Sequence, residues 1–322
     1  MIKIRAQLPH IDGRLFLTDA GLETDLIFNQ RVHIPEFASH TLLASSAGRA
    51  ALTRYYRGFL ALAERHRVGF ILDSPTWRAQ RHWANALGVS IAEMAAINRY
   101  AVDFVADLRD EFTAGRSTIL LNGVIGPRGD AYAPEALVSA DEAEDYHAEQ
   151  IGWLARTDVD MVSAMTFTQS SEAIGVVRAA RIAGLPVVIS FTVETDGLLP
   201  TGQPLGDAIA EVDAATDGSA AYFMINCAHP EHFRDALDAV EHIGRIRGLR
   251  CNASRCSHAE LDAAETLDDG DPIELAEGYS ELLAAMPWMN VFGGCCGTDL
   301  RHVSAIASAL IRDGQAARKA AS

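Results

Sequence analysis

Two adjacent cysteines near the end of the chain have the residue types and spacing that could bind a metal ion. Cys295 and Cys296 lie within the sequence GGCCGT, and Cys227 follows an apolar run much earlier in the chain. Adjacent cysteines do not readily bridge to each other, because their Cα atoms are only about 3.8 Å apart. The flanking glycines permit a sharp turn, so both sulfurs can face one soft metal ion. Three thiolates with one open position describe a catalytic zinc site.

The alternative is that these cysteines are small apolar side chains that fill core space. We favour the metal site, because Cys295 and Cys296 lie together between glycines after one apolar run, and Cys227 directly follows another apolar run that reads as a buried strand. The two remaining cysteines, Cys251 and Cys256, have no second cluster around them. We interpret them as ordinary thiols.

Composition limits the classes of function that the chain can have. The 322 residues are 49% hydrophobic and 22% charged, which supplies ample material for a core. The net charge of −16 argues against nucleic acid and against an anionic membrane surface as partners. Five cysteines without a regular framework fit a reducing compartment, and from the apolar pattern we expect neither a leader peptide nor a membrane span. We therefore expect a cytoplasmic protein that acts on small molecules; the sequence is compatible with a homo-oligomer but does not determine it.

Eight apolar runs alternate with segments of helical periodicity. Unbroken apolar runs indicate a parallel sheet that is covered on both faces, and eight repeats predict a single (β/α)8 TIM barrel over residues 1–322, with its core at about 12–311. A doubly wound open sheet is the competing arrangement, but neither a G-x-G-x-x-G fingerprint nor a Walker motif is present. The expected strands are 15–19, 68–73, 117–124, 159–165, 186–191, 220–226, 248–253 and 289–292. The expected helices are 50–67, 91–111, 141–156, 171–183, 207–214, 231–246, one that begins near 271, and 301–311.

In such barrels the site lies where the strands end. Asp19 ends the first expected strand and is a candidate for binding a substrate amine, although a turn-forming or capping role is equally compatible. Glu194 and Asn226 follow or end later strands and are further candidates for substrate binding. Trp77, in the loop after the second strand, could receive a cationic substrate by cation–π contact, and packing at the barrel mouth is its alternative role.

These motifs resemble the homocysteine S-methyltransferase family, which includes betaine-, S-methylmethionine- and folate-dependent enzymes. The resemblance rests on Cys227 and the GGCCGT segment, on DAGLETDL at 19–26, on GPRG at 126–129 and on SFTVE at 190–194. It covers residues 12–311 and implies a (β/α)8 barrel, zinc held by Cys227, Cys295 and Cys296, and a small thiol acceptor. The implied reaction moves a methyl group from a small onium donor to the thiolate of homocysteine, giving methionine.

One position departs from the family. The family commonly has a glutamate after the fourth strand that helps bind the amino group of homocysteine, and Met165 occupies that place here. The acceptor could therefore be a different small thiol, with Asp19 alone available for an amine. A zinc-binding barrel without turnover is the alternative of another class.

Overall fold

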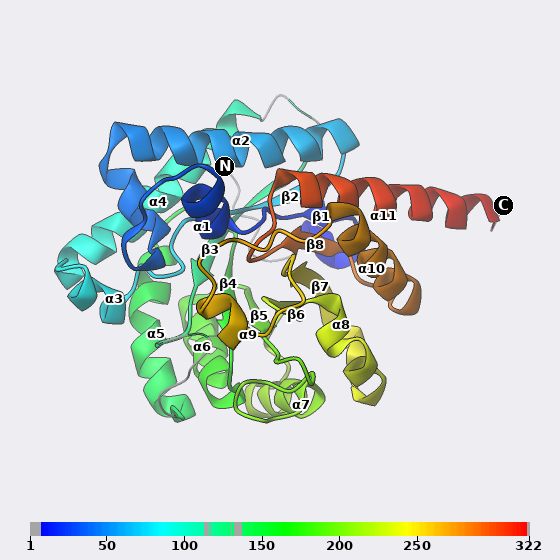
Figure 1. The fold of residues 1–322 in the computed structure, drawn as a ribbon. Coiled ribbons are helices and arrows are strands. Elements are labelled where there is room, and N and C mark those ends of the chain that lie inside the picture. Colours follow the sequence, from blue (N-terminus) through cyan, green and yellow to red (C-terminus); the bar gives the residue numbers. More distant parts are fainter. Residues whose placement is uncertain (1–7, 113–114, 116, 130, 132–136, 321–322) are drawn as a thin grey trace.

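Eight parallel strands close into a barrel in the computed structural model of the protein (Figure 1). The strands follow one another in chain order, and β8 pairs with β1 to complete the closure. This confirms the predicted single (β/α)8 barrel. The structure describes residues 8–112, 115, 117–129, 131 and 137–320. The strands are β1 (Phe16–Leu17), β2 (Gly69–Asp73), β3 (Ile119–Ile125), β4 (Met161–Phe167), β5 (Val187–Phe191), β6 (Tyr222–Asn226), β7 (Ile246–Cys251) and β8 (Val291–Gly294).

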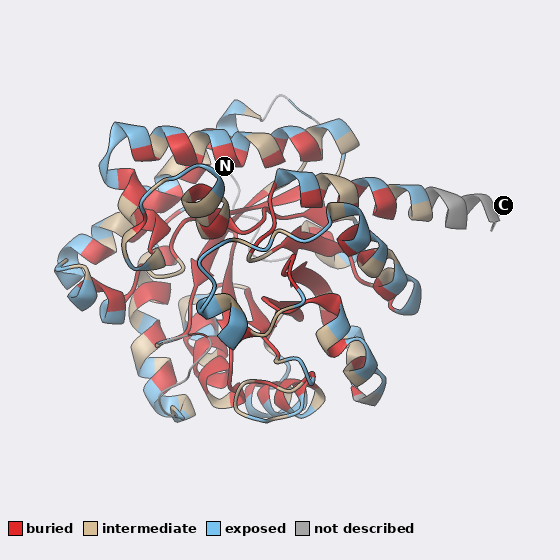
Figure 2. Ribbon diagram, in the orientation of Figure 1, coloured by how far each residue is buried: buried red, intermediate tan, exposed pale blue. Residues whose placement is uncertain are grey.

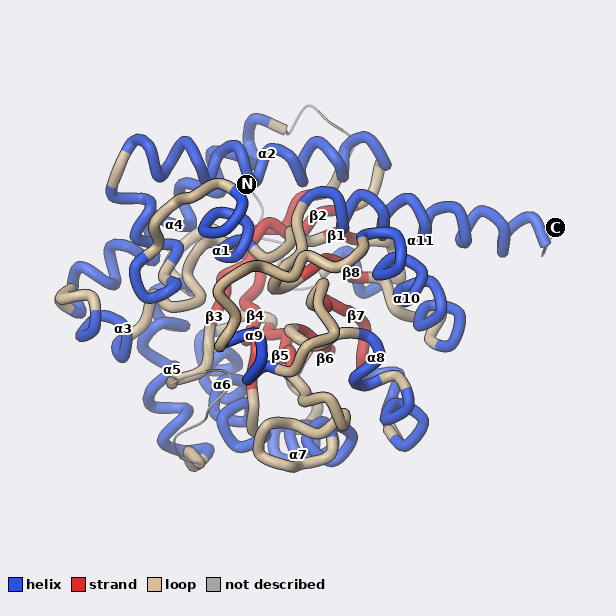
Figure 3. The backbone as a smooth tube through the Cα atoms, viewed as in Figure 1, coloured by secondary structure: helices blue, strands red, loops and turns tan. Residues whose placement is uncertain are grey.

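Helices surround the strands on the outside of the barrel (Figure 3). Three of them begin with a capping box, in which a serine and a glutamate three residues later bond to each other's backbone, at Ser90, Ser139 and Ser257. The α-helices are α1 (Leu22–Thr24), α2 (Ser46–His66), α3 (Arg81–Ala86), α4 (Ile91–Glu111), α5 (Ala140–Leu154), α6 (Ser170–Ala183), α7 (Leu205–Thr216), α8 (Pro230–Phe233), α9 (His258–Asp262), α10 (Pro272–Ala285) and α11 (Leu300–Ala320).

The apolar core has two layers, separated by the strands. The larger layer lies between the strands and the helices, where the inner faces of the helices are buried and their outer faces are exposed (Figure 2). The smaller layer fills the barrel interior, since alternate residues of a strand point to opposite faces. Its members come from nearly every strand: Phe16, Ile71, Leu120, Met161, Val188, Tyr222, Met224 and Val291.

A polar layer lies above this interior layer, towards the carboxyl ends of the strands. Residues two positions further along point into the barrel again, and these residues are polar except on β8, where the position is Gly293. All of them are buried: Thr18, Asp73, Asn122, Ser163, Ser190, Asn226 and Arg250. The barrel interior therefore changes from apolar to polar over two residues of most strands, and the polar layer forms the base of the candidate site.

One expected helix is wrong. Residues 231–246 have apolar side chains at helical spacing, but the structure forms only α8 there, followed by two 3-10 turns, Asp235–Ala239 and Ile243–Arg245. Strand β7 also begins two residues earlier than expected. Arg245 explains this, because its guanidinium binds the Asp213 carboxylate at 2.7 and 2.9 Å and the Ala220 carbonyl at 2.6 Å, which draws the chain against the start of β6. Tertiary contacts here outweigh local periodicity.

Within the described part of the chain, no helix is both long and apolar enough to span a bilayer.

The Tyr279 hydroxyl connects α10 to the ends of two strands. It accepts a hydrogen bond from the Cys251 amide and donates one to the Gly293 carbonyl, both at 2.7 Å, and the side chain is fully buried. Tyr279→Phe leaves both backbone groups unpaired, and we expect it to lower the free energy of unfolding by about 1–3 kcal/mol. Urea unfolding measures this. Tyr100→Phe is the matched control, because Tyr100 is 45% exposed; equal losses from the two variants would contradict the assigned role.

Candidate metal centre

The structure brings together the three cysteines that the sequence singles out. Cys227 follows β6, whereas Cys295 and Cys296 follow β8, on the other side of β7. Their sulfur atoms all lie within 4.8 Å of one another. The Cys227 sulfur is 2.6 Å from that of Cys295 and 3.7 Å from that of Cys296. All five cysteines of the chain are free of disulfides.

An unusual backbone conformation turns the Cys227 side chain towards this cluster. Cys227 has a φ of 57°, in the left-handed region that non-glycine residues rarely adopt. Its carbonyl accepts hydrogen bonds from Asn252 Nδ2 at 3.0 Å and from His258 Nε2 at 2.6 Å, which hold the turn in place. Backbone strain of this kind persists where the surroundings enforce it, and it is concentrated at functional sites.

The cysteine turn after β8 packs directly against the end of β1. A Cβ atom on Gly293 would lie 1.9 Å from Thr18 Oγ1, and one on Gly21 would lie 2.4 Å from the Cys295 carbonyl oxygen. Glycine is therefore required at both positions, because no side chain fits between the two segments. This close approach places the two sulfurs beside the loop that follows β1.

The donor set fits zinc. Zinc binds thiolates at about 2.3 Å in a tetrahedral arrangement, which separates two sulfurs by about 3.8 Å. The 3.7 Å separation between Cys227 and Cys296 agrees with this value, whereas Cys227 and Cys295 must move apart to share an ion. The group supplies three soft ligands and no carboxylate, which favours zinc over a hard cation.

The three thiols also alter one another's ionisation. Hydrogen bonds with Cys227 and Cys296 lower the pKa of Cys295 well below its ordinary value. Hydrogen bonds with Cys227 and Cys295 raise the pKa of Cys296. The cluster therefore favours at least one thiolate, which is the form that binds metal. By contrast, burial raises the pKa of Cys251 to about 12, in agreement with its interpretation as an ordinary thiol.

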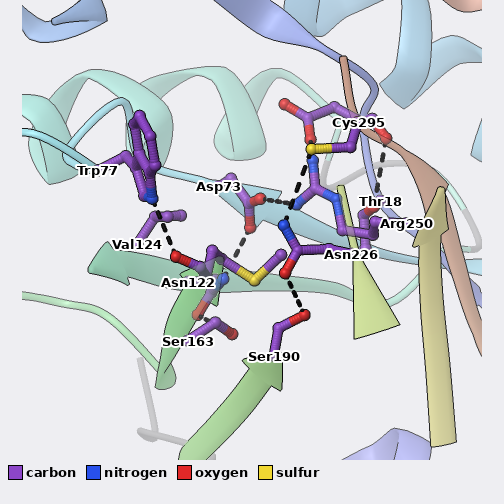
Figure 4. Close-up of polar contacts among 12 residues, drawn as sticks. Thr18, Asp73, Trp77, Asn122, Val124, Ser163, Ser190, Asn226, Arg250 and Cys295 are labelled. Carbon is purple, nitrogen blue, oxygen red and sulfur yellow. Dashed lines mark hydrogen bonds and ion pairs between the residues drawn. The ribbon is translucent and has the colours of Figure 1, made fainter. Parts of the chain in front are cut away.

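A buried ion cluster lies beside the cysteines (Figure 4). The Arg250 guanidinium forms ion pairs with the carboxylates of Asp19 and Asp73, and its Nε donates to the Gly294 carbonyl at 3.1 Å. Burial opposes the charge of Arg250, but Asp19 and Asp73 outweigh it and raise its pKa further. Burial raises the pKa of Asp19 to about 8, against the influence of Arg250. Asn122 Nδ2 donates to Asp73 at 2.7 Å and completes the cluster.

Asn226 connects the polar layer to the cysteines. Its Oδ1 accepts hydrogen bonds from the Thr166 amide at 2.9 Å and the Ser190 hydroxyl at 2.6 Å. These two contacts orient the amide, so that Nδ2 faces the Cys295 sulfur at 3.8 Å (Figure 4). Thr166 itself has a φ of 68°, a second left-handed residue next to the site.

The cysteines open onto a cavity of about 530 Å³ at the carboxyl ends of the strands. Asp19, Trp77, Met165 and Asn226 all line it. Trp77 Nε1 donates to the Met165 carbonyl at 3.0 Å, which holds the indole at the cavity wall. The Arg78 guanidinium lies 5.0 Å from the Trp77 ring centroid.

The structure connects Glu194 to the backbone of Cys227 through His258. Glu194 is absent from the described residues that line the cavity, and its carboxylate lies 3.0 Å from His258 Nδ1. His258 Nε2 in turn donates a hydrogen bond to the Cys227 carbonyl. Binding of substrate by Glu194 stays a prediction.

Sequence reasoning missed Arg250 and His258. The signal for Arg250 was available, because an arginine near the end of a strand must be paired when that strand is buried. Its carboxylate partners lie at the same edge of the barrel, Asp19 two residues after β1 and Asp73 at the end of β2. No local pattern marks His258, which follows β7 by seven residues and returns to Cys227 only in the folded chain.

Arg250→Met removes the only cation that contacts both carboxylates among the described residues. We expect a loss of about 3–5 kcal/mol in the free energy of unfolding, because the buried carboxylates remain unpaired. The loss should increase from about pH 5 to about pH 8, since burial raises the pKa of Asp19 and stability falls as an unpaired carboxyl group is forced to ionise. Urea unfolding at both pH values measures it. The control is Arg57→Met, which breaks an exposed pair with Glu111; a similar loss in both variants would contradict the assignment.

Comparisons with known proteins agree with this architecture. Over 281 residues the chain is 23% identical to homocysteine S-methyltransferase 3 of Arabidopsis thaliana, covering 77% of this chain and 78% of that protein. It is 28% identical over 189 residues to methionine synthase of Mycobacterium leprae (strain TN), covering 57% of this chain but only 14% of that much longer protein.

Among solved structures, the metallated form of the homocysteine methyltransferase MmuM from Escherichia coli superposes with a TM-score of 0.72. The match covers 92% of this chain and 96% of that chain at 18% identity, and it supports the fold. Residues 16–310 match the homocysteine S-methyltransferase family, a span that includes all eight strands and the three clustered cysteines. The chain therefore belongs to the homocysteine S-methyltransferase family.

Proposed function

We propose that this protein is a zinc-dependent S-methyltransferase that transfers a methyl group from a small onium donor, such as S-methylmethionine or a betaine, to the thiolate of homocysteine, giving methionine. Membership of the family supports methyl transfer to homocysteine. The observation that carries the zinc assignment is the cluster of three cysteine sulfurs within 4.8 Å of one another at the wall of a cavity.

Cys227, Cys295 and Cys296 would hold the metal. Bound zinc lowers the pKa of a thiol that coordinates it, and so supplies a nucleophilic thiolate at neutral pH. The amide of Asn226, fixed by Thr166 and Ser190, faces Cys295 and keeps that sulfur oriented. The methyl group leaves the donor without its bonding electrons, so a sulfonium becomes a neutral thioether and a quaternary ammonium becomes a tertiary amine.

The cavity has room for both reactants, and holding them in line supplies much of the rate. Trp77 is the aromatic residue that we assign to a cationic donor, since its hydrogen bond to Met165 fixes the ring at the cavity wall. Asp19 also lines the cavity, but its carboxylate is paired with Arg250. Binding of the substrate amine by Asp19 stays a prediction.

Cys295→Ser tests the metal assignment. We expect this variant to lose bound zinc and to lose methyl transfer to homocysteine by at least about a hundredfold, because serine is a poor zinc ligand and one of three thiolates is gone. Zinc content by elemental analysis and methionine formation from S-methylmethionine and from betaine measure the two effects. Cys256→Ser is the matched control and should retain both, since Cys256 lies outside the cluster.

The outcomes separate the proposal from its alternatives. Zinc that is retained in Cys295→Ser, or full activity without metal, would refute the assignment. A wild-type protein that binds zinc but methylates only another thiol would change the acceptor. Zinc binding with no methyl transfer from either donor to any thiol would point to a non-catalytic barrel.

A further inference from the structure

The cavity contains one half-buried carboxylate that the proposed function leaves unused. Asp19 and Asp73 are engaged by Arg250, whereas Glu36, Asp262 and Asp268 are exposed at the cavity rim. The remaining acid of the lining is Glu23, which is half-buried. Its carboxylate hydrogen-bonds with the Ser39 side chain and with its own backbone amide, and no described residue forms an ion pair with it.

Hydrogen bonds on both sides of Glu23 attach it to the cysteine turn. The Gly21 amide donates to the Thr298 carbonyl at 3.3 Å, and the Gly297 amide donates to Thr24 Oγ1 at 3.1 Å. Thr24 Oγ1 also donates to the Gly21 carbonyl at 3.0 Å, which closes the turn of α1 around Glu23. The backbone of Glu23 is therefore held beside the two residues that supply the cysteine sulfurs after β8.

The surroundings of Glu23 favour binding of a cation. Burial raises the pKa of Glu23, negative charge at Cys295 raises it further, and Ser39 and Arg78 oppose the shift. A carboxylate in this position is destabilised until a positive charge comes close, because neither water nor a paired cation fully compensates it. An arriving ammonium group would relieve that cost and gain a charge-assisted hydrogen bond.

We propose that Glu23 binds the ammonium group of the acceptor and thereby restricts the acceptor to aminothiols; this rests on the proposed function. The acceptor sulfur has to lie at the cysteines, and the amine of homocysteine is four bonds from its sulfur. That distance is at most about 5–6 Å, so the amine can reach only groups beside the cysteine cluster. Met165 also lines the cavity but is apolar, and the Trp77 ring already has the Arg78 guanidinium 5.0 Å from its centroid. Among the acids that line the cavity, Glu23 is the half-buried one that forms no ion pair with a described residue.

Thiol binding at the metal tests this directly, without turnover. In protein loaded with Co2+, coordination of a substrate thiolate gives a sulfur-to-metal charge-transfer band, which we would titrate with L-homocysteine and with 4-mercaptobutanoate, its analogue without the amine. We expect the wild type to bind homocysteine at least about tenfold more tightly than the analogue. Glu23→Gln should weaken homocysteine binding by about tenfold or more and leave binding of the analogue unchanged.

Asp25→Asn is the matched control, because it removes a negative charge two residues further on, from a carboxylate that binds Asn29 and Gln30 and does not line the cavity. It should leave both affinities unchanged. Metal content and thermal unfolding of each variant establish that the site is intact.

Four results would overturn the inference. Equal binding of the two thiols by the wild type would show that the amine is not recognised, while leaving the metal–thiol site in place. A Glu23→Gln variant that still prefers homocysteine would assign the amine to another group. An equal loss for both thiols would make Glu23 structural. A raised KM for the onium donor, with unchanged thiol affinities, would place the donor at Glu23. Failure of the wild type to bind either thiol at the metal would instead refute the proposed function itself.

Discussion

A single buried guanidinium joins the carboxyl ends of four strands. Arg250 on β7 binds Asp19 after β1, Asp73 at the end of β2 and the Gly294 carbonyl of β8. Because β1 pairs through only two residues on each side, the closure of the barrel between β8 and β1 has few ladder hydrogen bonds of its own. The ion cluster supplies a specific connection where the backbone supplies little. Two carboxylates and a guanidinium are stable in the interior only together, so the loss of any one of them leaves a buried charge unpaired.

The metal centre is built on that connection. The cysteine turn begins one residue after Gly294, and it packs so closely on the β1 loop that only glycine fits at Gly21 and Gly293. The same contact holds α1, and with it Glu23, beside the sulfurs. One constraint therefore sets the positions of the thiolates and of the acid that we assign to the acceptor. The third sulfur comes from Cys227, whose left-handed backbone is held by Asn252 and His258.

The polar layer inside the barrel separates the functions of the two halves of each strand. Below this layer, apolar side chains fill the interior and stabilise the fold, whereas the polar side chains of the layer orient the site above it. Asn226 shows the transition most clearly, because it lies two residues beyond Met224 on the same face of β6 and points its amide at Cys295. A change from apolar to polar at successive inward positions is visible in the sequence once the strand register is known.

The amino-acid sequence alone determined the barrel, because unbroken apolar runs and helical periodicity are local patterns repeated eight times, and it also determined which cysteines to consider. The capping box at Ser139 and the glycine that ends α6 are local signals as well, and the structure has both. Only the tertiary structure decided which groups meet. The pairing of Arg250 with Asp19 and Asp73, the contact of His258 with Cys227, and the broken helix over 231–246 depend on residues far apart in the chain. Such contacts form when strand ends converge at one edge of the barrel, and no pattern within a short window of sequence specifies them.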